Sequence, residues 1–320
     1  MKEMNKLAEY LRQSDDIIVI GHTNPDGDAH GSVIGLTLAL QKMGKRAAAC
    51  LPGGFNQLYA DFDCPVEVAS DEHLPFVPKT AFAVDVSEVF RLGALKDTFF
   101  GCERRALMDH HESNTGFAEV NVIDPAAAAA GEMAVELIEA LGVELDAEIA
   151  TWLYIAVVTD CGRFGYSCTR PQTMRAAAKL LEAGIDVDDI TRKVYSTRSE
   201  GRTRLLARVI SEMQFAFDKQ VCYALLTPKM YEECGAAAGD NESIVNYLLD
   251  IRGVQIAFIV EEKGVDAKVS LRSKPPVDVG ANVAQPLGGG GHACASGVTL
   301  KNMPIESALE KVLEYAGQAL

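Results

Sequence analysis

Residues 17–43 read IIVIGHTNPDGDAHGSVIGLTLALQKM, a short apolar run followed by a polar loop and a longer segment of helix-forming composition. The apolar run at 17–20 has the length of a buried strand, and residues 28–43 are long enough for a helix. Pro25 and Gly27 allow the intervening loop to turn tightly. The stretch therefore predicts a strand, a tight loop and a helix, the repeating unit of an α/β fold.

The same alternation continues through the first half of the chain. Short apolar runs that predict strands lie at 81–84 and 106–108. An amphipathic first helix is expected within residues 1–16. Further segments with helix-forming composition and length lie at 132–141, 148–158 and 172–181. Because strands that alternate with helices form parallel sheets, the predicted fold class is α/β with a parallel sheet.

The pattern changes after an arginine-rich stretch at 192–208. Strand-like segments follow at 221–226, 254–260 and 267–271, then four glycines at 288–291 and a closing helix from about Pro304. This order is typical of a second, smaller α+β domain. We therefore predict a parallel-sheet domain over residues 1–190, a helical connector over 191–215 and a smaller domain over 216–320.

Composition excludes several classes of protein. The 320 residues are 48% hydrophobic and 23% charged, as in globular enzymes, and no apolar run approaches the roughly 18 residues that span a bilayer. The N-terminus has no secretory signal pattern. Eight cysteines without a CxxC pair favour reduced thiols, and thus a cytoplasmic protein, and disfavour cysteine-bound zinc.

The net charge of −15 opposes binding of long nucleic acids, whose affinity comes mainly from Lys and Arg on phosphates. A small anionic ligand would need a local basic site. The arginine-rich stretch at 192–208 is one candidate, although a solvated helix face is the simpler interpretation.

The loop after the first predicted strand carries His22, Asp26 and Asp28 within seven residues. Open α/β sheets bind ligands at the carboxyl ends of their strands, and the following helix offers its positive end. The loop is therefore a candidate for divalent-metal binding. As an alternative, it is an ordinary turn in which Asp28 caps the helix.

Three more predicted elements end in side chains of the same kind. Asp85 follows the run at 81–84, and Asp160 follows an apolar helix. Asp109, His110 and His111 follow the run at 106–108. Carboxylates and imidazoles without thiolates suit Mn²⁺ or Mg²⁺ better than structural zinc.

These residues resemble the DHH phosphoesterases, whose defining triplet stands here as Asp109-His110-His111. The stretch LGGGGHACASG at 287–297 resembles the glycine-rich signature of the DHH-associated domain, so the likeness covers essentially the whole chain. Chain length and SLRS at 270–273 look most like the branch of bifunctional oligoribonucleases, or nanoRNases, and 3′-phosphoadenosine 5′-phosphate (pAp) phosphatases.

The resemblance implies a two-manganese hydrolase, with Mg²⁺ as the alternative metal. One ion would be held by His22, Asp26 and Asp85, and the other by Asp28, Asp85, His110 and Asp160, so that Asp85 bridges them. His111 would lie beside the substrate phosphate, and Asp109 would orient a histidine ring.

The expected substrates are short oligoribonucleotides, degraded to nucleoside 5′-monophosphates, and pAp. Arg272 and His292 would bring positive charge to the reacting phosphate. The substrate-binding residues expected from the resemblance are Arg272, Ser273, Gly288, Gly289, Gly290, Gly291 and His292. The sequence leaves a homodimer open.

Other functions fit many of the same residues. A linear or cyclic dinucleotide phosphodiesterase would use the same metals, and an inorganic pyrophosphatase would share the metal motifs but not the GGGGH run. A nucleotide sensor without activity would be expected to have lost metal ligands.

Two positions depart from the family pattern. His30 stands where relatives usually have an apolar residue, and we expect it on the helix surface. Cys161 stands where they usually have Thr, and we expect a small buried side chain.

Overall fold

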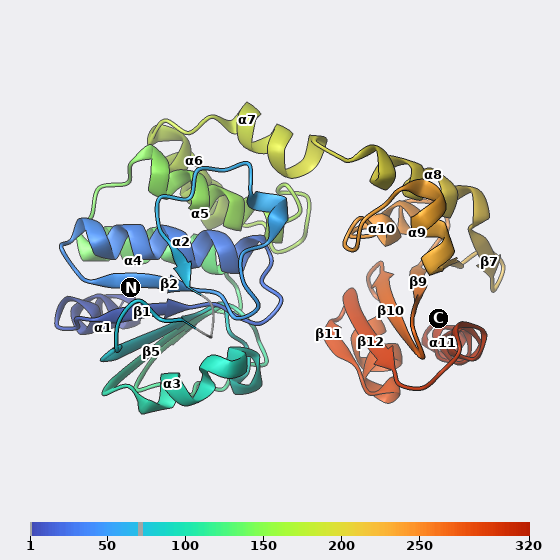
Figure 1. Ribbon diagram of the computed structural model, residues 1–320, viewed down its shortest axis with the longest axis horizontal. Coiled ribbons are helices and arrows are strands. Elements are labelled where there is room, and N and C mark those ends of the chain that lie inside the picture. Colours follow the sequence, from blue (N-terminus) through green and yellow to red (C-terminus); the bar gives the residue numbers. More distant parts are fainter. Residues whose placement is uncertain (1, 70–72) are drawn as a thin grey trace. The chain divides into compact units, whose positions relative to one another are not determined.

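The computed structural model describes residues 2–69 and 73–320. The chain forms two compact units, Met1–Thr197 and Arg198–Leu320 (Figure 1). The first unit consists of α1 (Lys2–Arg12), β1 (Ile17–Ile20), α2 (Gly27–Lys42), β2 (Ala47–Cys50), β3 (Val68–Ala69), β4 (Thr80–Val84), α3 (Lys96–Gly101), β5 (Arg104–Asp109), β6 (Val120–Ile123), α4 (Ala130–Leu141), α5 (Ala147–Asp160), α6 (Pro171–Glu182) and α7 (Val187–Thr191), with further short helical segments at Gln57–Tyr59, Val89–Leu95 and Arg192–Ser196.

The first sheet has the strand order β3-β2-β1-β4-β5-β6, and every pair in it is parallel. Successive residues of β1 point to opposite faces, so Ile17 and Val19 pack under α2 and α5 while Ile18 and Ile20 pack toward α3 (Figure 1). The predicted parallel α/β fold is confirmed. Strand order reverses between β1 and β4, and ligands of such sheets bind beyond the carboxyl ends at this point.

Glycines on α2 allow close packing against α5. A Cβ at Gly27 would lie 2.2 Å from Thr159 Oγ1, and one at Gly31 would lie 2.1 Å from the Trp152 carbonyl oxygen. Four-residue spacing places both glycines on one face of the helix. This contact brings the start of α2, with Asp28, to the end of α5, with Asp160.

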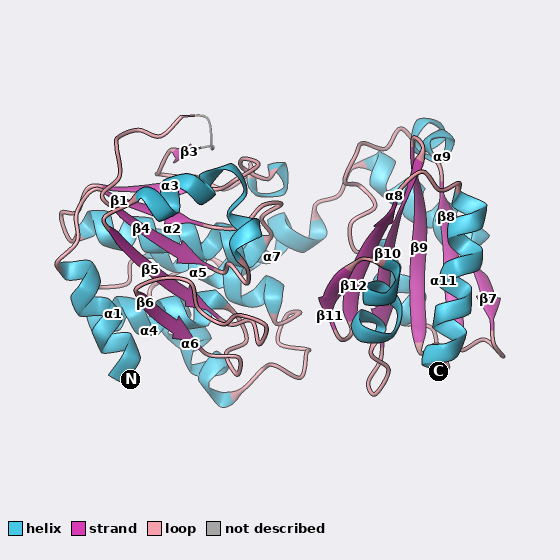
Figure 2. Cartoon of the chain, turned by 90° about the horizontal axis from the view of Figure 1, so that it is seen from below, coloured by secondary structure: helices cyan, strands magenta, loops and turns pink. Residues whose placement is uncertain are grey.

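The second unit consists of α8 (Glu200–Glu212), β7 (Gln214–Ala216), β8 (Val221–Leu226), α9 (Pro228–Cys234), α10 (Ile244–Leu249), β9 (Ile256–Lys263), β10 (Asp266–Ser273), β11 (Gly290–His292), β12 (Ala295–Leu300) and α11 (Ile305–Ala319), with short helical turns at Gly280–Ala284 and Gln285–Leu287. Its sheet has the order β11-β12-β10-β9-β8-β7, in which only β8 and β9 are parallel. Helix α11 packs on one face, and α8 and α10 pack on the other (Figure 2). The expected α+β architecture is thus present.

Charges in the arginine-rich stretch are largely paired along their own helices. Arg192 pairs with Asp189, Arg204 with Glu200, and Arg208 with Glu212. This pairing favours the interpretation of a solvated helix face. Within the described residues, no helix is both long and apolar enough to cross a membrane.

His30 and Cys161 are both buried. The expectation of a surface position was wrong for His30, which has no exposed area. Its Nδ1 lies 2.7 Å from the Asp26 carbonyl oxygen, its Nε2 accepts a 2.9 Å hydrogen bond from the Asn56 amide, and the Phe55 and Tyr59 rings pack against it. The buried position of Cys161 is confirmed.

Candidate active site

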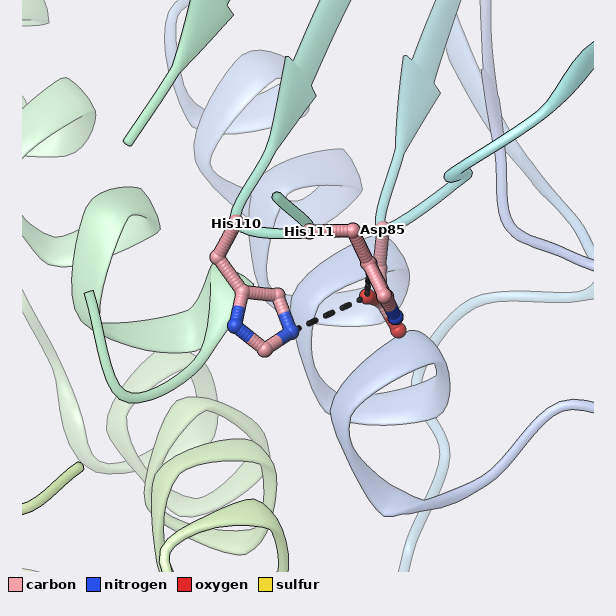
Figure 3. Close-up of side chains that lie close together, drawn as sticks. All are labelled: Asp85, His110 and His111. Carbon is pink, nitrogen blue, oxygen red and sulfur yellow. Dashed lines mark ion pairs between the residues drawn. The ribbon is translucent and has the colours of Figure 1, made fainter. Parts of the chain in front are cut away.

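Four segments deliver acidic and imidazole side chains to the carboxyl end of the first sheet. The β1–α2 loop brings His22 and Asp26, and the first turn of α2 brings Asp28. Asp85 directly follows β4, and Asp160 ends α5. His110 and His111 follow β5, and Figure 3 shows both rings pointing toward Asp85. The structure thus brings together all six residues expected to bind metal.

Asp85 lies at the centre of this cluster. Its Oδ2 is 3.5 Å from His22 Nε2, while its Oδ1 is 3.5 Å from His110 Nε2 and 3.6 Å from His111 Nδ1. The residue is 1% exposed, and Oδ1 has no hydrogen-bond partner among the described residues. Its φ of +59° is a left-handed conformation, which Asp tolerates better than most residues. The two oxygens of Asp85 therefore face two different groups of ligands.

Each group has donor atoms converging on one point. Nε2 of His22 lies 3.7 Å from Asp26 Oδ1, and the ligand atoms of His22, Asp26 and Asp85 all lie within 4.8 Å of one another. On the other side, Nε2 of His110 lies 3.6 Å from Asp28 Oδ2 and 3.4 Å from Asp160 Oδ2. Donors about 2.1 Å from an octahedral cation are about 3.0 Å apart, so modest contraction would enclose an ion in each group.

The two histidines His22 and His110 have raised pKa values because several carboxylates lie close to their rings. Burial opposes protonation of the His22 ring, but Asp26 and Asp85 raise its pKa to about 10. Burial has the same effect on His110, and its pKa is nevertheless raised to about 11 by the surrounding carboxylates.

The pKa values of the acids shift in two directions: those of Asp28 and Asp160 are raised, and that of Asp85 is lowered. Burial and the neighbouring charge of Asp85 raise the pKa of Asp28 well above its usual value. Burial also raises the pKa of Asp160, with help from Asp26 and Asp85, to about 7. For Asp85 burial is outweighed by the His110 and His22 rings, which hold its pKa well below the ordinary range. A bound cation would favour the ionised form of these buried carboxylates.

Backbone amides hold Asp28 in place. Its Oδ2 accepts a 2.6 Å hydrogen bond from the Ala130 amide, and its Oδ1 accepts from the Gly131 amide and the Ser32 hydroxyl. The residue that caps α2 is Asp26, which accepts from the amides of Asp28 and Ala29. The alternative in which Asp28 caps this helix is therefore wrong.

Asp109 and Arg91 each contact a histidine of the cluster. Asp109 is fully buried, with Oδ1 2.9 Å from His111 Nδ1, and its Oδ2 accepts a hydrogen bond from Asn114. Nη2 of Arg91 lies 3.0 Å from His22 Nδ1. Arg91 and Asn114 were not predicted from the sequence, although Arg91 stands only six residues after Asp85. The backbone donors Ala130 and Gly131 left no signal, because any residue has an amide.

Several comparisons with known proteins agree with this geometry. The pattern described as the DHH family, N-terminal domain, matches residues 16–157, and that of the DHHA1 domain matches residues 218–320. The bifunctional oligoribonuclease and PAP phosphatase NrnA of Thermus thermophilus is 33% identical over 323 residues, which cover 100% of this chain and 95% of the relative. The chain belongs to the DHH family. As a DHH-family phosphoesterase, it is a hydrolase that acts on phosphodiester or phosphate bonds.

Solved structures with the DHH fold extend the comparison. An exopolyphosphatase-related protein from Bacteroides fragilis has a TM-score of 0.91 and 26% identity, with 99% of this chain and 97% of that chain covered. The exonuclease RecJ bound to manganese has a TM-score of 0.59 and 14% identity, with 99% and 95% covered. The second likeness is one of fold.

The predicted substrate residues of this DHH-family chain lie in the second unit. Arg272 is on β10, His292 ends β11, and the glycines at 288–291 form the turn into β11 and its first residues. Ser273 does not join them: it is 4% exposed, and its hydroxyl donates to the Val277 carbonyl oxygen. Successive strand residues face opposite ways, so Ser273 points away from the side on which Arg272 lies. The side chain of Ser273 thus lies apart from the other predicted substrate residues, and substrate binding by Ser273 stays a prediction.

Proposed function

We propose that the protein hydrolyses short oligoribonucleotides to nucleoside 5′-monophosphates and removes a phosphate from pAp. The observation that carries the proposal is a relative of that stated activity, similar over the full length of both chains, in combination with a cluster that retains every expected metal ligand. A nucleotide sensor without activity would not need to keep all six metal ligands.

Two divalent cations fit the cluster. His22, Asp26 and Asp85 would hold one, and Asp28, Asp85, His110 and Asp160 would hold the other. The buried Asp85 Oδ1 without a hydrogen-bond partner and the raised pKa values of Asp28 and Asp160 support this assignment. Oxygen and imidazole donors favour Mn²⁺, with Mg²⁺ as the alternative. Bound ions would supply Lewis-acid stabilisation of the phosphoryl oxygens and acidify a coordinated water.

The chain's own side chains would orient and bind the substrate. His111 would contact the substrate phosphate, and Asp109 would fix the orientation of its ring through the 2.9 Å contact. In the second unit, Arg272, His292 and the glycines at 288–291 would bind the substrate's phosphates and sugar. We retain residues 1–190 as the catalytic domain, 191–215 as the connector and 216–320 as the substrate-binding domain.

The net charge and the cysteines support the proposed partners and cellular location. A net charge of −15 disfavours long nucleic acids as partners. All eight cysteines carry free thiols, which supports a cytoplasmic location.

The test compares hydrolysis of a 5′-labelled dinucleotide, pAp, a cyclic dinucleotide, pyrophosphate and a longer RNA in the presence of Mn²⁺. Asp85→Asn keeps the shape and the left-handed preference of the residue but removes its charge. The exposed Asp97 provides the matched control, Asp97→Asn. We expect turnover of the dinucleotide and pAp by wild type and the control, and loss in Asp85→Asn. Turnover confined to pyrophosphate or the cyclic dinucleotide would overturn the proposed substrates.

A further inference from the structure

The face of β10, β11 and β12 that lies opposite α11 carries polar side chains, and α10 contacts this sheet at β10. We call this polar surface the trough. Along β10, Lys268, Ser270 and Arg272 alternate with Val269 and Leu271, which are buried in the core under α11. The polar side chains therefore share the opposite face of the sheet. The three strands lie side by side at the edge of this sheet in both views (Figures 1 and 2).

Strand register arranges the trough in rows. Residues paired directly across antiparallel strands have side chains on the same face. The pairs form three successive rows: Arg272 with Ala295 and His292, then Ser270 with Gly297 and Gly290, then Lys268 with Thr299. Basic side chains thus stand at both ends, and the middle row offers one hydroxyl and two glycines.

The glycine turn forms one wall of the trough. A Cβ at Gly289 would lie 2.2 Å from the Gly297 carbonyl oxygen, so the turn packs directly on β12. Between this turn and β10 lies a cavity of about 360 Å³, lined by Lys268, Ser270 and Thr299 among others. The cavity therefore lies toward the Lys268 end, beyond the row that holds Arg272 and His292.

Lys268 has no acidic partner among the described residues. The side chain is exposed. The acid paired with it on β9, Glu261, is already bound by Lys263, Tyr231 and Asn241. An exposed lysine without an acidic partner, at the rim of a cavity that offers hydroxyls, suits an anionic ligand with polar groups.

The distance between Lys268 and Arg272 indicates which anionic ligand can contact both residues. Arg272 lies four residue steps beyond Lys268 along the strand, which is about 14 Å. Successive phosphorus atoms of an oligonucleotide are six covalent bonds apart, and six bonds of an extended chain span at most about 7 Å. Two phosphate repeats therefore match the distance between the two basic ends.

We propose that Lys268, Ser270 and Thr299 form a distal phosphate subsite, which binds the phosphate two repeats away from the one at Arg272 and His292. The proposal rests on the proposed function and deepens it. A 5′-phosphorylated trinucleotide has three phosphates and reaches both ends of the trough. The bisphosphate pAp has two phosphates one repeat apart and reaches only one end.

The test measures kcat/KM for a 5′-phosphorylated trinucleotide and for pAp with the full-length protein, and takes the ratio of the two values. Lys268→Gln should lower this ratio about tenfold, the effect of one lost hydrogen bond to a charged group. Lys268→Arg keeps the charge and should retain most of the ratio. The exposed Lys311 on α11 provides the matched control, and Lys311→Gln should leave the ratio unchanged.

The outcomes separate the two proposals. A wild type that cleaves neither substrate overturns the proposed function and the distal subsite with it. A wild type that cleaves both, combined with an unchanged ratio in Lys268→Gln, overturns the distal subsite alone. Equal losses on both substrates also overturn it, because pAp does not reach Lys268.

Discussion

The carboxylate of Asp28 accepts a 2.6 Å hydrogen bond from the amide of Ala130, the first residue of α4. The residue before α4, Ala129, has no side chain that could cap this helix, so the acid from α2 provides the acceptor. Asp28 is also a proposed metal ligand. Packing between α2 and α4 and the geometry of the cluster are therefore coupled, and changes to either should affect the other.

Metal uptake should release protons. Without metal, His22 and His110 are protonated at pH 7, since their pKa values are raised to about 10 and 11, and Asp160, with a pKa of about 7, is half protonated. A metal binds only the deprotonated ligands. The apparent Kd for Mn²⁺ should therefore fall at least about tenfold per pH unit between pH 6 and 8. Calorimetric titration at several pH values measures this, and a Kd independent of pH would refute it.

The buried Glu132 should contribute measurably to stability. Its carboxylate, 3% exposed, accepts hydrogen bonds from Arg170, Thr173 and the Ala128 amide. Glu132→Ala leaves the partly exposed Arg170 without its closest partner, and we expect a loss of about 2 kcal/mol in the free energy of unfolding. Urea denaturation measures the loss. Glu136→Ala, at an exposed position of the same helix, should stay within about 0.5 kcal/mol.

Close packing between α2 and α5 should be required for metal binding. In Gly31→Ala the new Cβ would meet the Trp152 carbonyl oxygen at 2.1 Å, and the helices must separate. We expect about 2–3 kcal/mol of destabilisation. Because separation moves Asp160 away from Asp28, Mn²⁺ affinity should also fall. Gly101→Ala has open space around its Cβ and should change neither quantity. Normal metal affinity in Gly31→Ala would contradict the coupling.

His30 should make the protein sensitive to acid. Burial lowers the pKa of His30 to about 4, so its folded form binds fewer protons than its unfolded form between pH 4 and 6.5. The contribution of neutral His30 to the free energy of unfolding is fully present above pH 6.5. It is lost as the pH falls from 6.5 towards 4, because the unfolded chain then binds a proton that the folded chain does not. Between pH 7 and 5 the loss is about 2 kcal/mol. His30→Leu should be less stable at pH 7 yet lose less on acidification, as urea denaturation at both pH values would show. Identical losses in both proteins would contradict this role.

Much of the fold and cluster could be predicted because local patterns determine them. The strand Ile17–Ile20 and the polar residues after each strand follow from periodicity and from the place where parallel strands end. His30 was misplaced because the Asn56 amide and the Phe55 and Tyr59 rings that surround it come from a later loop, which no local pattern reveals. The burial of Ser273 was not foreseen, although neighbouring residues of a strand face opposite sides of the sheet. Support from the Ala130 amide is invisible in a sequence.

In the proposed metal site, Asp85 bridges two divalent cations. A crystal structure with Mn²⁺, with an anomalous difference map recorded for manganese, tests it most directly. We expect two peaks, one between Asp85 Oδ2, His22 and Asp26, and one between Asp85 Oδ1, Asp28, His110 and Asp160. A single peak, or a peak that Asp85 does not contact, would contradict it.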